Sequence, residues 1–313
     1  MKATGPGITA EIVPRGPFSL RAAAGFGFGP NQGRPDPFDG NLRLAFCADG
    51  GGHAGVALRQ DGDAGVLQVL MHGTADPTRL LAQTARILSL DHDGQEFLAV
   101  GERDPVIGRL QREHPGQRPV LFSSPYEAAA WSIISARRPA AQGARVRAAL
   151  AEQLGKEFVL AGRTLAAFPE PQRLLAVEPM PGLPPEKVAR LHGVAEAALD
   201  GRLDPGRLQE LGPERATEEV RSLRGIGPFY AGLIVLRASG FADAMLSAPE
   251  PKVMAHVARL YGLPAPRACS SLRDWPSPGV PFARGRPCWC AWRATVPGRR
   301  AIPPVTFYRP FRT

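Results

Sequence analysis

The sequence predicts a mainly α-helical protein that begins with an α+β subdomain containing an antiparallel sheet. Within residues 12–90, short apolar runs alternate with polar residues between turns rich in Gly, Asp and Asn, as strands do. From residue 96 onward, apolar residues recur at helical spacing in segments that start near Pro, Ser or Asp and mostly end near Gly. These patterns predict an α+β subdomain at 1–95, a helical region at 96–266 and an atypical tail at 267–313.

Length and composition exclude several classes of protein. The chain has 313 residues, of which 44% are apolar and 21% charged, as expected for a globular protein with a sizeable core. No segment approaches the roughly 20 apolar residues of a membrane span, and residues 1–16 lack the apolar core of a secretion signal. We therefore expect a cytoplasmic protein, a monomer, with no membrane partner.

Particular segments carry the expected elements. In the α+β subdomain, strands are predicted at 41–49 (NLRLAFCAD) and 65–73 (GVLQVLMHG), and a helix is predicted at 76–90 behind an Asp-Pro start. In the helical region no strand is predicted. The helical segments there are 104–114, 124–155, 168–179, 184–201 and 204–212.

A Gly-Ile-Gly break separates two further helices. A short amphipathic helix at 216–223 is followed by Gly225, Ile226 and Gly227, and Pro228 opens the next helix. Glycines there can take positive φ and permit close approach of another backbone, while Ile226 can fill the core between the helices. The amides at a helix N-terminus face outward together and suit a phosphate. An ordinary glycine-containing turn is the alternative.

Residues 223–243, LRGIGPFYAGLIVLRASGFAD, resemble the helix-hairpin-helix of the DNA glycosylase superfamily, specifically the bacterial DNA-3-methyladenine glycosylase II family. The resemblance extends over about 13–266 and is strongest at 121–262. It implies a helix-hairpin-helix DNA glycosylase fold of three subdomains, with the hairpin at 218–240 facing DNA.

The resemblance also assigns contacts to the hairpin, which in this family binds one DNA phosphate and often a monovalent cation. Such contacts position the duplex without reading its sequence. By position, the phosphate falls to the amides of Gly225, Gly227 and Tyr230, and the cation to the carbonyls of Arg221, Leu223 and Ile226.

A glycosylase flips its target base out of the stack and stabilises positive charge on the sugar with a carboxylate. The family places an Asp just before a terminal helix that ends in Leu-Tyr-Gly. Counting back from Leu260 gives Glu250, which we predict as the catalytic carboxylate, with Glu in place of Asp. A solvated acid at a helix N-terminus is the alternative. Asp243 matches a family position that we interpret as structural.

Two further positions follow from the resemblance. Relatives that also cut the backbone carry Lys two residues after the second glycine; here that residue is Phe229, which predicts a monofunctional enzyme and a wall of the base pocket. Phe229 could equally be a core aromatic. The segment SARRPAAQ matches the wedge that fills the gap left by the flipped base, so Arg137 and Arg138 are predicted to contact DNA. Exposed surface arginines are the alternative.

Cofactors other than the hairpin cation are not expected. Three of the four Cys lie in the tail, which leaves Cys47 alone and argues against a disulfide framework, a cysteine-rich metal site and an iron–sulfur cluster. Asp91, His92 and Asp93 could suggest a metal site, but a solvated loop explains them better.

The tail, 267–313, holds nine Arg and one Asp with no Lys or Glu, and so carries +8 of the net charge of +9. It is either a genuine basic arm or the product of a shifted reading frame. A shift by two bases lets the codons behind 274–293 encode the last helix that the family has there. Sequencing codons 260–290 of the gene in independent isolates distinguishes the two.

Together, these features predict a base-excision DNA repair N-glycosylase that removes alkylated bases of the 3-methyladenine type from double-stranded DNA. A catalytically degenerate DNA-binding protein is the alternative, favoured by Glu250 and by the tail. A helical protein-interaction domain is the third hypothesis, and it does not require DNA binding.

Overall fold

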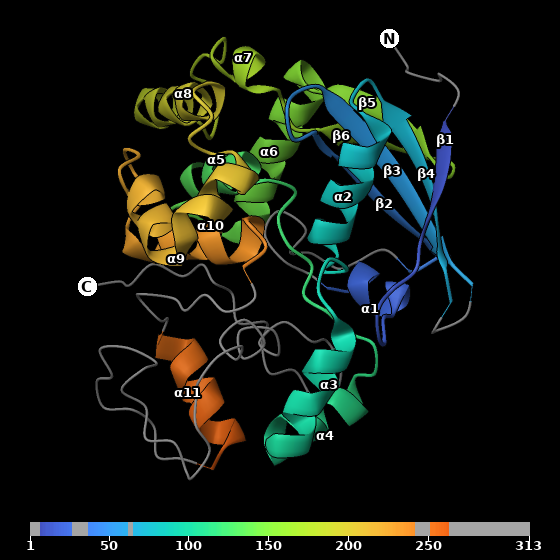
Figure 1. Cartoon of the computed structure of the whole chain (residues 1–313). Helices are drawn as coiled ribbons and strands as arrows, with labels where there is room; N and C mark the ends of the chain where they lie inside the picture. The colour runs from blue at the N-terminus through green and yellow to red at the C-terminus, as the bar shows by residue number, and fades with distance from the viewer. Residues whose placement is uncertain (1–6, 27–36, 62–64, 242–250, 263–313) are drawn as a thin grey trace.

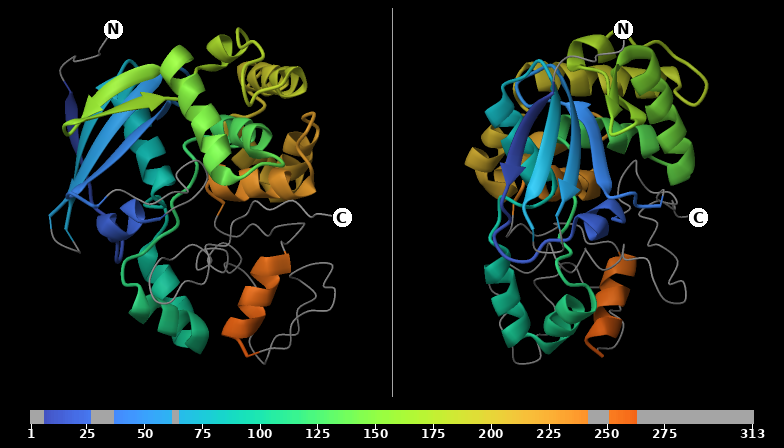
Figure 2. Two further views of the ribbon diagram at one scale, coloured as in Figure 1. Left: turned by 180° about the vertical axis from the view of Figure 1, so that it is seen from behind. Right: turned by 90° about the vertical axis from the view of Figure 1, so that its right-hand side faces the viewer.

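The structure is a computed structural model that describes residues 7–26, 37–61, 65–241 and 251–262 (Figure 1). A four-stranded sheet lies at one side of the molecule, and most of the helices form the other side (Figures 1 and 2). The mainly α fold with an N-terminal antiparallel sheet is therefore confirmed. The predicted tail, 267–313, lies outside the described residues.

The sheet is antiparallel throughout, in the order β1-β4-β3-β2. In β4, the buried Leu67, Val69 and Met71 alternate with more exposed residues, so that one face packs into a core. The predicted strands at 41–49 and 65–73 correspond to β2 and β4. The strands are β1 (Ile8–Ile12), β2 (Asn41–Cys47), β3 (His53–Gln60) and β4 (Leu67–Gly73).

Two helices accompany the sheet, α1 (Leu20–Ala24) and α2 (Pro77–Ile87). α2 begins as its sequence predicts, because the Asp76 carboxylate accepts the Arg79 amide at 3.0 Å and Pro77 occupies the first turn. Its buried Leu80 and Ile87 belong to the same apolar cluster as the inner face of the sheet.

A second, two-stranded sheet corrects the prediction that residues from 96 onward are only helical. β5 (Lys156–Leu160) and β6 (Arg163–Ala167) form a hairpin. Its two-residue turn, Ala161 and Gly162, has φ of 42° and 80°, which is the backbone that tight hairpins require. Phe158 of β5 packs so closely on Gly55 of β3 that a Cβ there would lie 2.5 Å from the ring.

The helical body starts its helices with local signals. Asp104, Ser124 and Asp204 each accept amides of the first turn, and a Pro follows each of them. The helices are α3 (Gly94–Arg103), α4 (Pro105–Glu113), α5 (Pro125–Ser135), α6 (Ala140–Leu154), α7 (Pro171–Leu174), α8 (Pro185–Leu199), α9 (Pro205–Arg221), α10 (Pro228–Ala238) and α11 (Pro251–Leu260).

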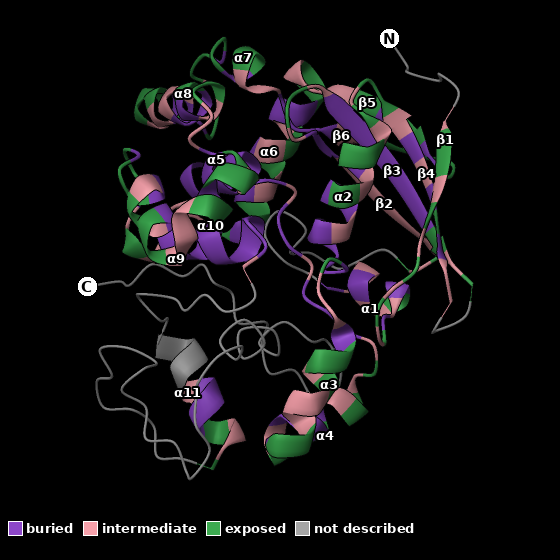
Figure 3. Cartoon of the chain, in the orientation of Figure 1, coloured by how far each residue is buried: buried purple, intermediate pink, exposed green. Residues whose placement is uncertain are grey.

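The centre of this body is α5, all of whose residues are buried (Figure 3). α6, α8 and α10 pack around it. α9 is kinked at Gly212, where φ is 77° and Pro213 follows. The kink separates the two helical segments that the sequence predicts at 204–212 and 216–223.

A buried ion pair joins the helical body to the sheet. Glu127 of α5 is only 4% exposed; it accepts the Cys47 amide of β2 at 2.9 Å and pairs with Arg147 of α6 at 2.7 Å. Burial raises the pKa of the Cys47 thiol, whose Sγ donates to the Phe168 carbonyl at 3.0 Å. Within the described part of the chain, no helix is long and apolar enough to cross a bilayer.

Candidate DNA-binding and catalytic site

The helix-hairpin-helix is formed by the end of α9, a turn and the start of α10. In the turn, the Leu223 amide donates to the Val220 carbonyl at 3.2 Å, and the Ile226 amide donates to the Leu223 carbonyl at 3.0 Å. Ile226 is 4% exposed and belongs to the main core, as its position between the glycines suggests. The turn is thus anchored from inside, while Gly225 lies at its exposed outer side.

The two glycines serve different purposes. Gly225 has φ of +92°, which only glycine adopts readily. Gly227 has φ of −81° and is the N-cap of α10, so the prediction of positive φ holds for only one of them. A Cβ on Gly227 would meet nothing within 4 Å. Open space at this N-cap permits the backbone of a ligand to approach the helix end closely.

The start of α10 has the properties of an anion site. Amides in the first turn of a helix lack acceptors within the helix, and Gly227 has no side chain to cap them. The regular helical hydrogen bonding of α10 begins with the Ala231 amide, which donates to the Gly227 carbonyl at 3.0 Å. The predicted phosphate contact through Tyr230 would fall within this turn, so the geometry suits that prediction.

The carbonyls predicted to hold a monovalent cation lie on the same turn. Backbone carbonyl oxygens are hard ligands, which suit an alkali cation. The Leu223 oxygen accepts one hydrogen bond, from Ile226, and a carbonyl has a second lone pair for a cation. The donor set of Arg221, Leu223 and Ile226 therefore fits such an ion in its chemistry.

The wedge segment follows α5 directly. Arg137 is exposed and has φ of +57°, an uncommon backbone for a residue other than glycine. Arg138 is half-buried, and its Nη1 donates to the Gly182 carbonyl at 2.6 Å. Burial lowers the pKa of Arg138. Arg138 is thus held by a hydrogen bond within the protein, whereas Arg137 is exposed to solvent in the loop.

Two basic residues of α8 that the sequence analysis did not single out, Lys187 and Arg190, contact the wedge segment and the hairpin turn. Lys187 Nζ donates to the carbonyls of Ile134 at 2.9 Å and Ala136 at 2.8 Å, and so caps the C-terminal end of α5 just before Arg137. Arg190, one turn further along, lies against Gly225. The only sequence signal was a basic pair in the first half of a helix, where the dipole favours acids.

Burial is the main cause of a lowered pKa for Lys187, which falls to about 8, and the charges of Arg138 and Arg190 add to it. These three cations therefore lie within electrostatic reach of one another. The wedge loop, the first half of α8 and the hairpin turn meet at this point, and Ile133 of α5 also lies against Gly225.

Phe229, predicted as a pocket wall, follows the hairpin on α10. Its ring packs edge-to-face on Tyr230, with 5.5 Å between the ring centroids. Both rings are half-buried and pack against the main core. This placement accommodates a core aromatic and a pocket wall alike, so the role of Phe229 remains a prediction.

The predicted catalytic Glu250, like Asp243, lies outside the described residues. The next residue, Pro251, starts α11, which ends at Leu260 as the family pattern of Leu-Tyr-Gly indicates. Tyr261 donates its hydroxyl to the Asp104 carboxylate at 2.7 Å. This bond connects the residue after α11 to the N-cap of α4, and the two helices lie near each other at one end of the molecule (Figure 2).

Residues 91–93 have structural tasks. Asp93 caps α3 by accepting the Gln95 amide at 2.8 Å, and His92 Nε2 lies 3.1 Å from the Gly240 carbonyl oxygen. Burial raises the pKa of Asp91. In the described part of the chain, no group of three or more His, Cys, Asp or Glu is arranged to hold a metal ion.

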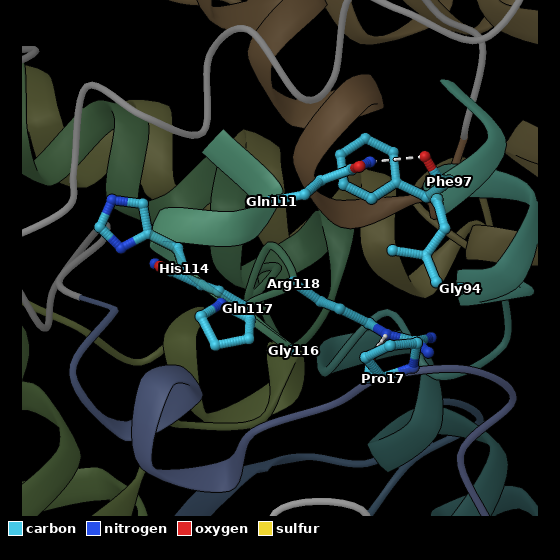
Figure 4. Close-up of a pocket in the computed structure, with 10 residues that line it drawn as sticks. Pro17, Gly94, Phe97, Gln111, His114, Gly116, Gln117 and Arg118 are labelled. Atoms are coloured by element: carbon cyan, nitrogen blue, oxygen red, sulfur yellow. Dashed lines mark hydrogen bonds between the residues drawn. The ribbon is translucent and has the colours of Figure 1, made fainter. Parts of the chain in front are cut away.

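A small cavity of about 90 Å³ lies beside α3 and α4 (Figure 4). Gln111 lines it and donates to the Phe97 carbonyl at 2.6 Å, while Arg118 donates to the carbonyls of Pro17 and Ser89. Its volume is below the roughly 300 Å³ of ordinary ligand pockets, and none of the predicted site residues lines it. The cavity is therefore not assigned to the predicted site.

The N-terminal antiparallel sheet, the helical body and the helix-hairpin-helix together form a fold that this chain shares with solved structures of DNA glycosylases. A 3-methyladenine DNA-glycosylase from Archaeoglobus fulgidus has a similar structure, with a TM-score of 0.63 over 80% of this chain and 86% of that one at 21% identity. An 8-oxoguanine glycosylase/lyase from Clostridium acetobutylicum, in complex with double-stranded DNA, has a TM-score of 0.56 over 84% of this chain and 88% of that one at 17% identity.

In sequence, the chain is similar to the DNA-3-methyladenine glycosylase of Bacillus subtilis (strain 168), with 25% identity over 167 residues. The match spans 50% of this chain and 52% of that protein, so the chain spans about half the length of the curated relative. No protein-family model matches the chain. The resemblance to DNA-3-methyladenine glycosylases that the sequence motifs predict is thereby confirmed.

Proposed function

We propose that the protein is a monofunctional DNA N-glycosylase that flips alkylated bases of the 3-methyladenine type out of double-stranded DNA and removes them. The observation that carries this proposal is the hairpin turn. Gly227 leaves the N-terminus of α10 open to an anion, because a Cβ there would meet nothing within 4 Å, and the turn belongs to a fold that DNA glycosylases share.

In the proposed complex, one backbone phosphate sits on the amides of Gly225, Gly227 and Tyr230. A monovalent cation on the carbonyls of the turn would add positive charge behind that phosphate. Arg137, exposed at the tip of the wedge loop, fills the gap in the stack or meets a neighbouring phosphate. These contacts hold the duplex while the target nucleotide rotates out.

The chemistry is assigned to Glu250. The bond between the sugar C1′ and the base nitrogen breaks, the base leaves with the bonding electrons, and water adds to C1′. A carboxylate stabilises the positive charge that develops on the sugar and accepts a proton from the water. An alkylated purine is already cationic, so it leaves without prior protonation.

The absence of backbone cleavage is proposed from Phe229. A lyase needs an amine that attacks C1′ and forms a Schiff base, and the residue at the corresponding position of α10 has only an aromatic ring. This ring can instead stack on a flipped cationic base.

Single-turnover release of methylated purines from alkylated duplex DNA tests the proposal. The native chain should release them, Glu250→Gln should lower the rate by at least about 100-fold, and Glu157→Gln on the exposed face of β5 should leave it unchanged. Borohydride should trap no covalent adduct with abasic DNA. Release that persists in Glu250→Gln would remove this carboxylate from the mechanism.

A catalytically degenerate DNA-binding protein is the second candidate, because Glu250 stands where the family has Asp. Its longer side chain shifts the carboxylate by one methylene, and misplacement of that size affects rates strongly. Salt-sensitive DNA binding without any base release would favour this candidate. Base release restored by Glu250→Asp would then identify the longer side chain as the cause.

A further inference from the structure

The side chain of Arg190 lies across the outer face of the hairpin turn. A Cβ at Gly225 would lie 2.7 Å from Arg190 Cδ and 3.1 Å from its Nε. The aliphatic part of the arginine thus packs directly on the glycine. A side chain at residue 225 is disfavoured both because the φ of this residue is positive and because Arg190 occupies the space that a Cβ would need.

The guanidinium of Arg190 is incompletely satisfied. Its Nη2 donates to Glu186, one turn earlier on α8, and the carboxylate side chain is 65% exposed. The Nε atom is buried and has no hydrogen-bond partner among the described residues. A charged donor without an acceptor is costly, and 27% of the Arg190 side chain is exposed. The guanidinium, which has five N–H donors, therefore has donors left for an acceptor that comes from outside the chain.

Two further cations lie near the Arg190 guanidinium. Lys187 and Arg138 lie close enough to Arg190 for their charges to lower the Lys187 pKa together with burial. Glu186 is the acid that pairs with Arg190. An anion placed between these cations and the open N-terminus of α10 relieves their repulsion and is attracted by both.

We infer that Arg190 is a positioning residue for DNA, whose guanidinium shares with the hairpin amides the backbone phosphate bound at Gly225 and Gly227. Glu186 holds the guanidinium in place until the phosphate arrives. This inference rests on the proposed function, since it needs double-stranded DNA as the ligand. It adds a charged contact from α8 to a site otherwise made of backbone.

The test is the salt dependence of duplex binding, measured by fluorescence anisotropy with the full chain and an abasic-site duplex. Arg190→Met keeps the aliphatic part over Gly225 but removes the charge. It should weaken binding at low salt about tenfold and lower the slope of log Kd against log salt by about 1. Arg190→Lys should restore the slope but only part of the affinity, since lysine lacks the planar donor array.

Arg109→Met is the matched control, because Arg109 and Glu113 form an ion pair of the same spacing on α4, at 3.9 Å. Glu186→Gln provides a second test, which can still be carried out if Arg190→Met fails to fold. It removes a competitor for the guanidinium and should tighten DNA binding about threefold, whereas a purely structural ion pair predicts no gain.

Equal slopes and affinities for Arg190→Met and Arg109→Met would overturn the inference while leaving the glycosylase proposal standing. An unchanged or weaker affinity of Glu186→Gln would also overturn it. Native protein that binds duplex DNA without salt dependence would overturn both.

Discussion

Replacing Gly225 by Ala tests whether the hairpin turn is built as the structure indicates. The φ of +92° costs a residue with a Cβ roughly 1 kcal/mol. The new Cβ would also lie 2.7 Å from Arg190 Cδ and 3.1 Å from Ile133 Cδ1, and overpacking of this kind costs about 1–3 kcal/mol. Because Arg190 is 27% exposed and can move, we take the lower end and expect a loss of about 2 kcal/mol.

Two other glycines separate these contributions. Gly162, in the β5–β6 turn, has φ of +80° and nothing within 4 Å of a Cβ, so Gly162→Ala should cost only about 1 kcal/mol. Gly227 has a negative φ and open space, so Gly227→Ala should cost about 0.5 kcal/mol as a changed helix cap. Thermal unfolding should shift by about 2–4 °C per kcal/mol. A Gly225→Ala protein as stable as Gly162→Ala would refute the contact with Arg190.

Three further changes have outcomes fixed by single contacts. Tyr261→Phe removes the hydrogen bond to Asp104 and should lower the free energy of unfolding by about 1.5 kcal/mol. Because α11 is then held less firmly, base release in single-turnover assays should slow more than DNA binding weakens in anisotropy assays. Lys187 titrates near 8 when folded and at 10.5 when unfolded, so the unfolded state binds more protons between these values. Stability relative to Lys187→Met should therefore rise with pH over that window, by about 1 kcal/mol after allowance for solvent screening, in urea titrations at pH 7 and 10. Glu127→Ala leaves the largely buried Arg147 without its carboxylate partner, and urea unfolding should show that the free energy of unfolding falls by about 3–4 kcal/mol. A decrease below about 1 kcal/mol would mean that water solvates this ion pair.

What the sequence could predict depends on whether the signal is local. Helix starts at Asp104 and Ser124 follow from a capping side chain and a proline within a few residues. The β5–β6 hairpin escaped prediction because its strands are short and depend on distant contacts. Arg43 of β2 donates to the Leu160 carbonyl at 2.9 Å, and Phe158 packs on Gly55. The partners in these contacts, Arg43 and Gly55, lie more than 100 residues earlier in the sequence, so residues 156–167 alone do not predict the hairpin.

In the candidate site, too, the residues with a local signal were predicted and those that depend on distant contacts were not. Gly225 and Ile226 are recognisable because this turn needs a residue with positive φ followed by an apolar residue that fills the core. The role of Arg190 is invisible in the sequence, where it reads as an ordinary partner of Glu186 four residues earlier. Only packing of α8 against the hairpin shows that its aliphatic part covers Gly225.

The first half of α8 links the two parts of the proposed DNA-binding site. Lys187 holds the end of α5 from which the wedge loop departs, and Arg190 lies on the hairpin turn that we propose binds a phosphate. Three residues apart on one helix, they lie on the same face, about 5–6 Å apart at their Cβ atoms. A rigid helix therefore fixes the distance between the proposed phosphate grip and the wedge. Because DNA is rigid over a few base pairs, a wedge held at constant distance from a gripped phosphate would enter the stack at a constant position. On this view, selection of the nucleotide to be flipped depends on α8 as much as on the hairpin itself.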